Sequence, residues 1–194
     1  MTQEEGQVGS FNPRAFLDIP LAYTKQPVLF NIVQLLDISH SKLSQLYDWL
    51  ELGDPNKVPI DTLKKSRNHQ LSKKEENDKD PAFANFQRMT GNNVYRILLR
   101  DSWGNYCYAY EYQDKLPFLR QNRLTATCSN NPLGARMLVS QGTLIMNGVL
   151  MLQKTQCQYL GVTESDRQLL ESLNSNLEQK YIDYLKEELK ANNG

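Results

Sequence analysis

The 194-residue chain is poor in residues that form covalent cross-links or hold metal ions. Its three cysteines, Cys107, Cys128 and Cys157, are widely spaced, and its two histidines are His40 and His69. An odd number of cysteines without a paired-cysteine motif does not predict a disulfide framework or a structural zinc site. We therefore expect three reduced thiols, no bound metal and no cofactor.

Long apolar runs and an excess charge of either sign are also lacking. No run approaches the roughly 18 apolar residues of a membrane span, and the first residues do not follow the signal-peptide pattern. We expect a soluble intracellular protein with no membrane partner. The 22 basic and 22 acidic residues give a formal net charge of zero. The chain as a whole has no electrostatic attraction to nucleic acid, so any DNA contact must come from a local patch.

Recognised catalytic motifs are absent from the sequence. It contains no GxSxG elbow, no glycine-rich phosphate loop and no HExxH motif, and its two histidines lie far apart. Asp37, Asp101 and Asp114 fall at the expected ends of strands or in turns, where aspartates are commonly solvated. No catalytic residue is assigned, and a non-enzymatic protein is favoured.

What the sequence does contain is a series of short β-rich segments. Residues 27–38 form a near-continuous apolar run that is typical of a long, curled strand. A hairpin is predicted for residues 94–112, with its turn at residues 102–105. Further strands are expected at residues 135–140, 143–152 and 157–160. Because no βαβ alternation occurs, the pattern predicts an all-β core with helical appendages, folded as a small Greek-key barrel over residues 27–162.

Four tyrosines lie on one face of the second hairpin strand. They are Tyr106, Tyr108, Tyr110 and Tyr112. Exposed rings in such a barrel would stack on nucleic-acid bases, whereas buried rings would pack in the core or beneath a helix. No lysine or arginine is interleaved with the tyrosines, and Glu111 lies on the opposite face. These two observations favour packing over base stacking.

The two ends of the chain differ from the barrel. Residues 1–26 predict an irregular or partly helical lead-in. Residues 163–194 predict one C-terminal helix, capped through Thr163 with Asp166 or Ser165 with Gln168. Its apolar face is formed by Leu169, Leu170, Leu173, Leu177, Tyr181 and Leu185. We expect this face to pack on the barrel in preference to another molecule.

A long polar insertion follows the first barrel strand, at residues 54–90. Structureless segments of this length are usually functional or disordered. One interpretation is that apolar side chains anchor on a partner while basic ones approach phosphates; the other is a solvated loop. The apolar candidates are Val58, Pro59, Ile60, Leu63 and Leu71. The candidate DNA-binding residues are Lys64, Lys65, Arg67, Lys73 and Lys74.

Several segments look familiar in their order along the chain: FNIVQLLDISHSKLSQL, VYRILLRD, AYEYQ and GARMLVSQGTLIMNGVLMLQKTQCQYLG. The resemblance that they carry covers residues 27–161. They resemble the oligonucleotide/oligosaccharide-binding (OB-fold) domain of the RecQ-mediated genome instability protein 1 family, including an insertion after the first strand. Animal members also carry an N-terminal helical bundle and a second barrel, so this chain resembles the compact fungal form.

The resemblance implies a non-catalytic accessory subunit of topoisomerase III, which acts in the nucleus with a RecQ-family helicase to dissolve double Holliday junctions. It implies that the barrel docks on the topoisomerase and that the insertion reaches the DNA gate and biases its opening. The apolar insertion residues then become candidate topoisomerase contacts, and single-stranded or junction DNA is a further candidate partner. The alternative is a stand-alone single-stranded-DNA-binding module, which the zero net charge disfavours.

Overall fold

The computed structural model describes residues 8–53, 93–119 and 133–191. The insertion, with every candidate topoisomerase-binding and DNA-binding residue predicted from the sequence, lies outside the described residues. The chain divides into two compact units. The first comprises Met1–Ser39 and Asn93–Ser175, and the second comprises His40–Asn92 and Asn176–Gly194. The domain boundaries drawn from the sequence stay a prediction.

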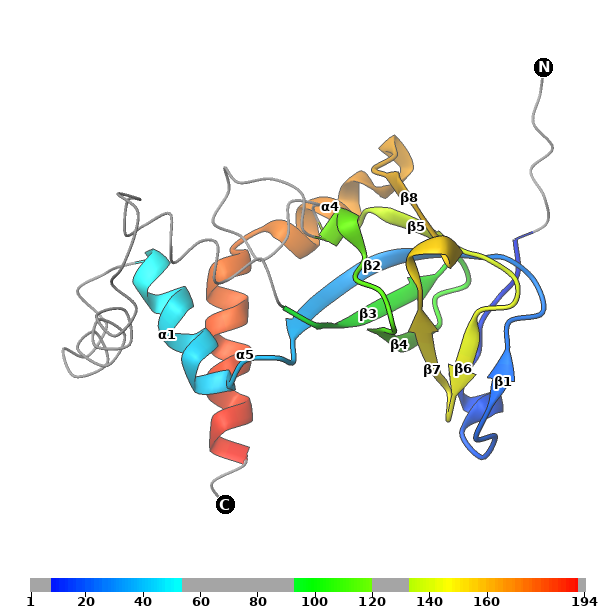
Figure 1. The fold of residues 1–194 in the computed structure, drawn as a ribbon. Helices are drawn as coiled ribbons and strands as arrows, with labels where there is room; N and C mark the ends of the chain where they lie inside the picture. Colours follow the sequence, from blue (N-terminus) through cyan, green and yellow to red (C-terminus); the bar gives the residue numbers. More distant parts are fainter. Residues whose placement is uncertain (1–7, 54–92, 120–132, 192–194) are drawn as a thin grey trace, which may run out of the picture. The chain divides into compact units, whose positions relative to one another are not determined.

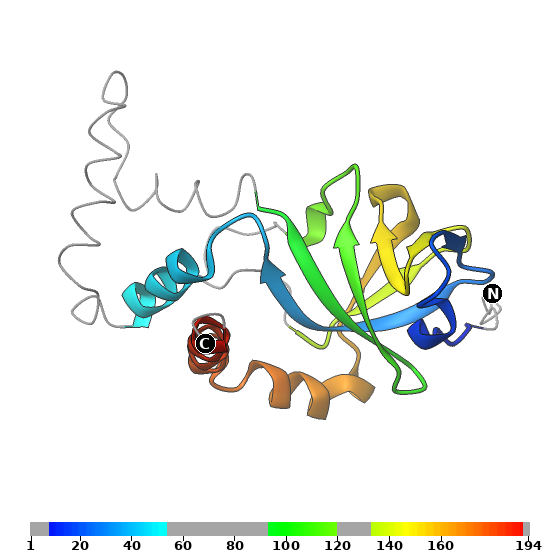
Figure 2. The same cartoon turned by 90° about the horizontal axis from the view of Figure 1, so that it is seen from below.

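The first unit contains an eight-stranded sheet, curled into a half-barrel, in the order β1-β6-β7-β4-β3-β2-β5-β8 (Figures 1 and 2). Its strands are β1 (Ala22–Tyr23), β2 (Val28–Asp37), β3 (Tyr95–Asp101), β4 (Tyr106–Glu111), β5 (Arg136–Val139), β6 (Leu144–Met146), β7 (Val149–Leu152) and β8 (Cys157–Gly161). Short 3₁₀ turns are η1 (Pro13–Phe16), η3 (Pro117–Leu119), η4 (Lys154–Gln156) and η5 (Glu164–Asp166). β4 pairs with β7 in parallel, and the other strand pairs are antiparallel. The predicted β core with helical appendages is confirmed.

Alternation of side chains explains how the sheet covers its core. Along β3, Tyr95, Ile97 and Leu99 are buried, while the residues between them are only half-buried. β2 starts with the same alternation, but its register shifts between Ile32 and Gln34. Such a bulge increases local twist and bends the strand. The near-continuous apolar run therefore forms one long strand, β2, which curls around the core as the sequence predicts.

The N-terminal lead-in docks on this sheet. Phe11 is buried, and its ring stacks on Phe16 at 5.5 Å between centroids and meets Phe30 edge-on at 6.2 Å. The backbone N–H of Gly9 donates to the carbonyl of Pro27 at 2.9 Å. Residues 8–16 are therefore an integral part of the first unit.

The C-terminal segment forms two helices, α4 (Arg167–Asn174) and α5 (Leu177–Ala191), and the expectation of one continuous helix is wrong. The break falls at Ser175, which is extended with ψ at 126°, and at Asn176, whose φ of 51° is left-handed. Asparagine tolerates this conformation better than most residues. α4 belongs to the first unit and α5 to the second. The apolar face that the sequence predicts for one helix is therefore divided between two units.

The second unit pairs α5 with α1 (Lys42–Gly53). The rings of Trp49 and Tyr181 stack at 5.1 Å between centroids, and both side chains are buried. The Lys42 ammonium forms an ion pair with Glu188. In α1, the buried side chains of Leu46 and Trp49 lie three positions apart, on one side of the helix. Among the described helices, none is long and apolar enough to cross a membrane.

Candidate functional site

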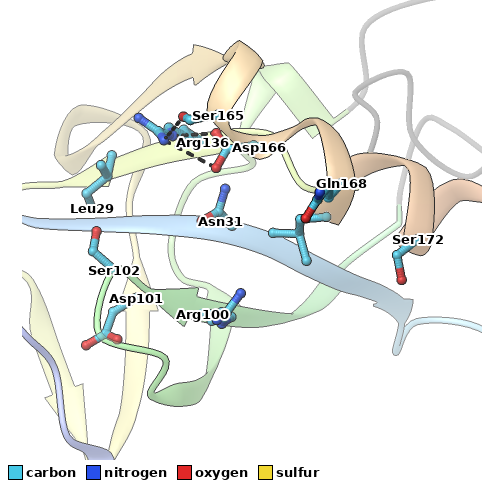
Figure 3. Close-up of a pocket in the computed structure, with 11 residues that line it drawn as sticks. Leu29, Asn31, Arg100, Asp101, Ser102, Arg136, Ser165, Asp166, Gln168 and Ser172 are labelled. Carbon is cyan, nitrogen blue, oxygen red and sulfur yellow. Dashed lines mark hydrogen bonds and ion pairs between the residues drawn. The ribbon is translucent and has the colours of Figure 1, made fainter.

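An open cleft of about 520 Å³ lies on the outward side of the sheet in the first unit, beside α4 (Figure 3). β2 and β3 contribute Leu29, Asn31, Arg100 and Asp101, and Ser102 follows them in the turn. Arg136 of β5 also lines it, together with Ser165, Asp166, Gln168, Leu169 and Ser172 from η5 and α4. The cleft therefore brings together segments separated by more than a hundred residues of sequence.

Strand register places four outward side chains in one row across the sheet. Arg136 of β5 pairs with Asn31 of β2, Asn31 pairs with Arg100 of β3, and Arg100 pairs with Tyr106 of β4. Neighbouring strands in a sheet lie about 4.8 Å apart. The two guanidinium groups and one aromatic ring therefore originate within a few strand spacings of one another.

Arg136 is already neutralised in this structure. Its Nε donates to Asp166 Oδ2 at 2.5 Å, and its Nη2 donates to Asp166 Oδ1 at 3.2 Å and to Ser165 Oγ at 2.8 Å. Desolvation by burial acts to raise the pKa of Asp166, but hydrogen bonds from Arg136 and Thr163 hold that pKa below its ordinary value. The ion pair fixes η5 against β5 and leaves Arg136 with little charge for a ligand.

Arg100 is the cation of the cleft that stays unneutralised. Its guanidinium makes no ion pair within the described part of the chain, and its buried Nε has no hydrogen-bond partner there. Figure 3 accordingly draws interactions from Arg136 and none from Arg100. A buried donor without a partner costs about 1–3 kcal/mol. An anionic ligand in the cleft would recover that cost.

The neighbouring Asp101 does not serve as the counter-ion of Arg100. The sequence predicts a solvated turn aspartate, and this is wrong, because Asp101 is only 2% exposed. Its Oδ1 accepts from the N–H groups of Trp103 and Asn105, and its Oδ2 accepts from Ser10 Oγ, the N–H of Phe11 and Asn105 Nδ2. Figure 3 shows the carboxylate turned away from the cleft. Asp101 thus ties the lead-in to the β3–β4 turn.

The tyrosine face of β4 also differs from the prediction. Tyr106 and Tyr108 are 53% and 44% exposed, whereas Cys107 and Ala109 fill the core. The preference for buried rings is therefore wrong at these two positions. Only one face of a strand can point into a barrel, and at β4 the interior accepts the smaller side chains.

Arginines interleave with these tyrosines across strands instead of along one strand. The register pairs Arg96 with Tyr110 and Arg100 with Tyr106, and the Arg96 guanidinium lies 4.8 Å from the centroid of the Tyr108 ring. We call Arg96, Leu98, Arg100, Tyr106 and Tyr108 the Arg–Tyr face. Sequence reasoning missed it by searching within β4 alone. The register of the predicted hairpin, read together with alternation, would have revealed it.

The acidic residue that argued against nucleic acid is directed elsewhere. Glu111 Oε2 accepts from the N–H of Tyr95 at 2.9 Å, and Oε1 accepts from the N–H of Leu116 at 2.8 Å. Its carboxylate therefore accepts hydrogen bonds from backbone N–H groups on the face of β4 opposite the tyrosines. Asp37 likewise makes local hydrogen bonds, to the N–H and hydroxyl of Ser39. Neither carboxylate belongs to the cleft.

Comparison with known proteins adds to this geometry. The family model described as "RMI1, N-terminal OB-fold domain" matches residues 12–171, a span that includes every strand of the sheet. RecQ-mediated genome instability protein 1 of Saccharomyces cerevisiae is 24% identical over 205 aligned residues, which cover 96% of this chain and 78% of that protein. The match takes in well over half of the chain, including both strands of the Arg–Tyr face. The chain therefore belongs to the RMI1 family, and its curled sheet is the N-terminal OB fold of that family.

Proposed function

We propose that this protein is a non-catalytic accessory subunit of a nuclear complex of topoisomerase III and a RecQ-family helicase, which dissolves double Holliday junctions. The family match over residues 12–171 carries this proposal. The yeast relative, named for RecQ-mediated genome instability, aligns with nearly the whole chain and supports the same role.

The chemistry of the cleft favours binding over turnover. Its two carboxylates are engaged in structural hydrogen bonds, Asp166 with Arg136 and Asp101 with the β3–β4 turn. The group left available is the guanidinium of Arg100, which offers N–H donors and no acceptor. Such a group can hold an anion, but it cannot act as a general base.

The way the chain leaves the barrel suits a subunit that acts through its insertion. The N–H of Ile38 donates to the carbonyl of Val94 at 2.9 Å, so residues 39 and 93 adjoin at one end of the β2–β3 ladder. The length of the segment between these two residues can vary without opening the sheet, because a longer loop adds little to the entropic cost of closing it. We infer that the insertion contacts the topoisomerase and prefers one state of its DNA gate. A difference in affinity of about 1.4 kcal/mol would shift the gate equilibrium about tenfold.

The test replaces residues 56–85 with a short Gly-Ser linker. We expect cooperative melting to persist, because the Ile38–Val94 closure and the core are retained. Binding to the topoisomerase should persist in part through the barrel, while stimulation of decatenation and junction dissolution should be lost.

Two matched variants keep the insertion at full length. One changes Val58, Pro59, Ile60, Leu63 and Leu71 to Ser, and the other changes Lys64, Lys65, Arg67, Lys73 and Lys74 to Ala. Loss of stimulation in the first variant alone would indicate apolar anchoring on protein. Full stimulation by the linker variant would refute the role of the insertion, and failure of the intact protein to bind topoisomerase III would refute the accessory role itself.

The stand-alone single-stranded-DNA-binding module is the second candidate, favoured by the exposed Arg–Tyr face. It requires that DNA binding by the protein alone accounts for its activity. A junction-dissolution assay distinguishes the two candidates. A stand-alone module would stimulate dissolution equally well with a topoisomerase that it does not bind, whereas an accessory subunit would stimulate only the topoisomerase that it binds.

A further inference from the structure

We propose that the outward face of β1, β6 and β7 docks an amphipathic helix of a partner protein. This surface lies outside the insertion and outside the Arg–Tyr face. The inference rests on the accessory role, because the helix is sought in the topoisomerase or the helicase. It adds a contact that the role by itself does not require.

The three strands carry apolar side chains on both of their faces. Inward residues such as Ile145 and Leu150 are buried in the core. Strand register joins Tyr23 to Leu144 and Leu144 to Met151 on the opposite face. The outward positions are Leu21, Tyr23, Leu144, Met146, Val149 and Met151. Antiparallel strands with a solvated outer face normally alternate apolar with polar residues. Six apolar outward positions are instead typical of a face that another element covers.

This face is open to solvent on its β1 side. Leu21 and Tyr23 are each 55% exposed, and Met146 is 39% exposed. The lead-in enlarges the surface with the exposed side chains of Leu17 and Ile19, and the carbonyl of Ile19 accepts a hydrogen bond from the β6–β7 turn at 3.2 Å (Figure 1). We call these five residues the apolar patch. Contiguous apolar patches on a protein surface commonly mark a protein-binding site.

The size of the apolar patch favours a small partner element over a second copy of this chain. Five side chains that are each about half exposed offer roughly 400 Å² of apolar surface, which is the size of a functional patch. Each partner in a standard protein interface buries about 800 Å². A helix of three turns is about 16 Å long and about 10 Å wide, so one face of such a helix covers the patch.

Backbone chemistry favours a helix over an extended segment. A strand that lies flat on an apolar face leaves backbone N–H and C=O groups unpaired, which is unfavourable. A helix pairs its own backbone groups, and helices cover sheet faces in layered folds. The five patch residues carry no charge, so the partner must present an apolar stripe, with anchors at positions i, i+3, i+4 and i+7.

The experiment places the photoreactive analogue p-benzoylphenylalanine at Tyr23 of the full chain, which is irradiated after assembly with topoisomerase III and the RecQ-family helicase. We expect cross-links to one segment of one partner, with apolar residues at helical spacing. The same analogue at Trp103, an exposed residue of the β3–β4 turn, is the control and should not cross-link to that segment.

A synthetic peptide of the cross-linked segment then measures affinity. Leu21→Ser and Met146→Ser should each weaken its binding by about 5- to 30-fold, because each removes one apolar contact. Met146→Leu should bind like the parent, because it keeps the apolar surface. Leu160→Ser is the matched control, since it changes an exposed leucine on β8, at the other end of the sheet order. Melting curves verify that each variant is folded.

Three results would overturn the proposal and leave the accessory role intact. They are an assembled complex without cross-links from Tyr23, cross-links to a second copy of this chain or to a segment without helical spacing, and folded serine variants that bind the peptide as tightly as the parent. Failure of the complex to assemble would overturn both the proposal and the accessory role.

Discussion

Replacing Asp101 with Asn should destabilise the first unit strongly, although the two side chains have nearly the same shape. Each carboxylate oxygen has its own donors: two N–H groups of the β3–β4 turn on Oδ1, and Ser10, Phe11 and the Asn105 amide on Oδ2. The amide of Asn keeps one oxygen and presents an NH₂ group to the other set of donors. At least two hydrogen bonds to a charged acceptor are lost.

Hydrogen bonds to a charged group contribute about 1.5–3 kcal/mol each and do not add fully, so we expect a loss of about 3 kcal/mol of unfolding free energy. For a chain of this size, 1 kcal/mol lowers the melting temperature by about 2–4 °C. The melting temperature of Asp101→Asn at pH 7, followed by circular dichroism, should therefore fall by about 6–12 °C. Asp18→Asn, at an exposed site of the same lead-in, is the control. A fall of less than 2 °C for Asp101→Asn would refute the reasoning.

The same carboxylate predicts a pH dependence. Desolvation by burial acts to raise the pKa of Asp101, but the hydrogen bonds from Asn105, Phe11 and Ser10 hold it below the ordinary value of 3.8. A lowered pKa in the folded state stabilises the protein above the ordinary value, and the stabilisation is lost as the pH falls through the folded pKa. The gap in melting temperature between the parent and Asp101→Asn should therefore be full at neutral pH and narrow below about pH 4.

Two further predictions concern backbone and thiols. In urea unfolding, Gly134→Ala should lower the free energy of unfolding by about 1–2 kcal/mol more than Gly142→Ala does. Both glycines have positive φ, but only at Gly134 would a Cβ meet the α4 backbone, at 3.2 Å. Equal losses for the two variants would contradict the docking of α4. Burial raises the pKa of Cys157 to about 12 and that of Cys107 still further. In a Cys128→Ser background, the buried thiol of Cys107 should react with Ellman's reagent at pH 8 only after denaturation, and the half-buried thiol of Cys157 should react slowly. Rapid reaction of both thiols in the native protein would contradict this prediction.

Much of the first unit could be read from local patterns. The alternation in β3 and β4, the polar turn between them and the apolar run of β2 predict the hairpin and the long first strand, because the side-chain period of a strand is local information. Local patterns did not reveal where the C-terminal helix breaks. Ser175 and Asn176 are compatible with a helix, and the break becomes evident only once α4 and α5 have separate partners to pack against.

The amino-acid sequence by itself determined the class of fold, the family and which residues of each strand share a face. The tertiary structure alone decided which of the two faces of β4 points outward and which arginines lie next to the tyrosines. It also decided the burial of Asp101, whose donors Ser10 and Phe11 stand about ninety positions earlier in the chain. The physical reason is that periodicity is a property of neighbouring residues, whereas strand register, docking and the pairing of charges depend on segments that meet only after the chain has folded.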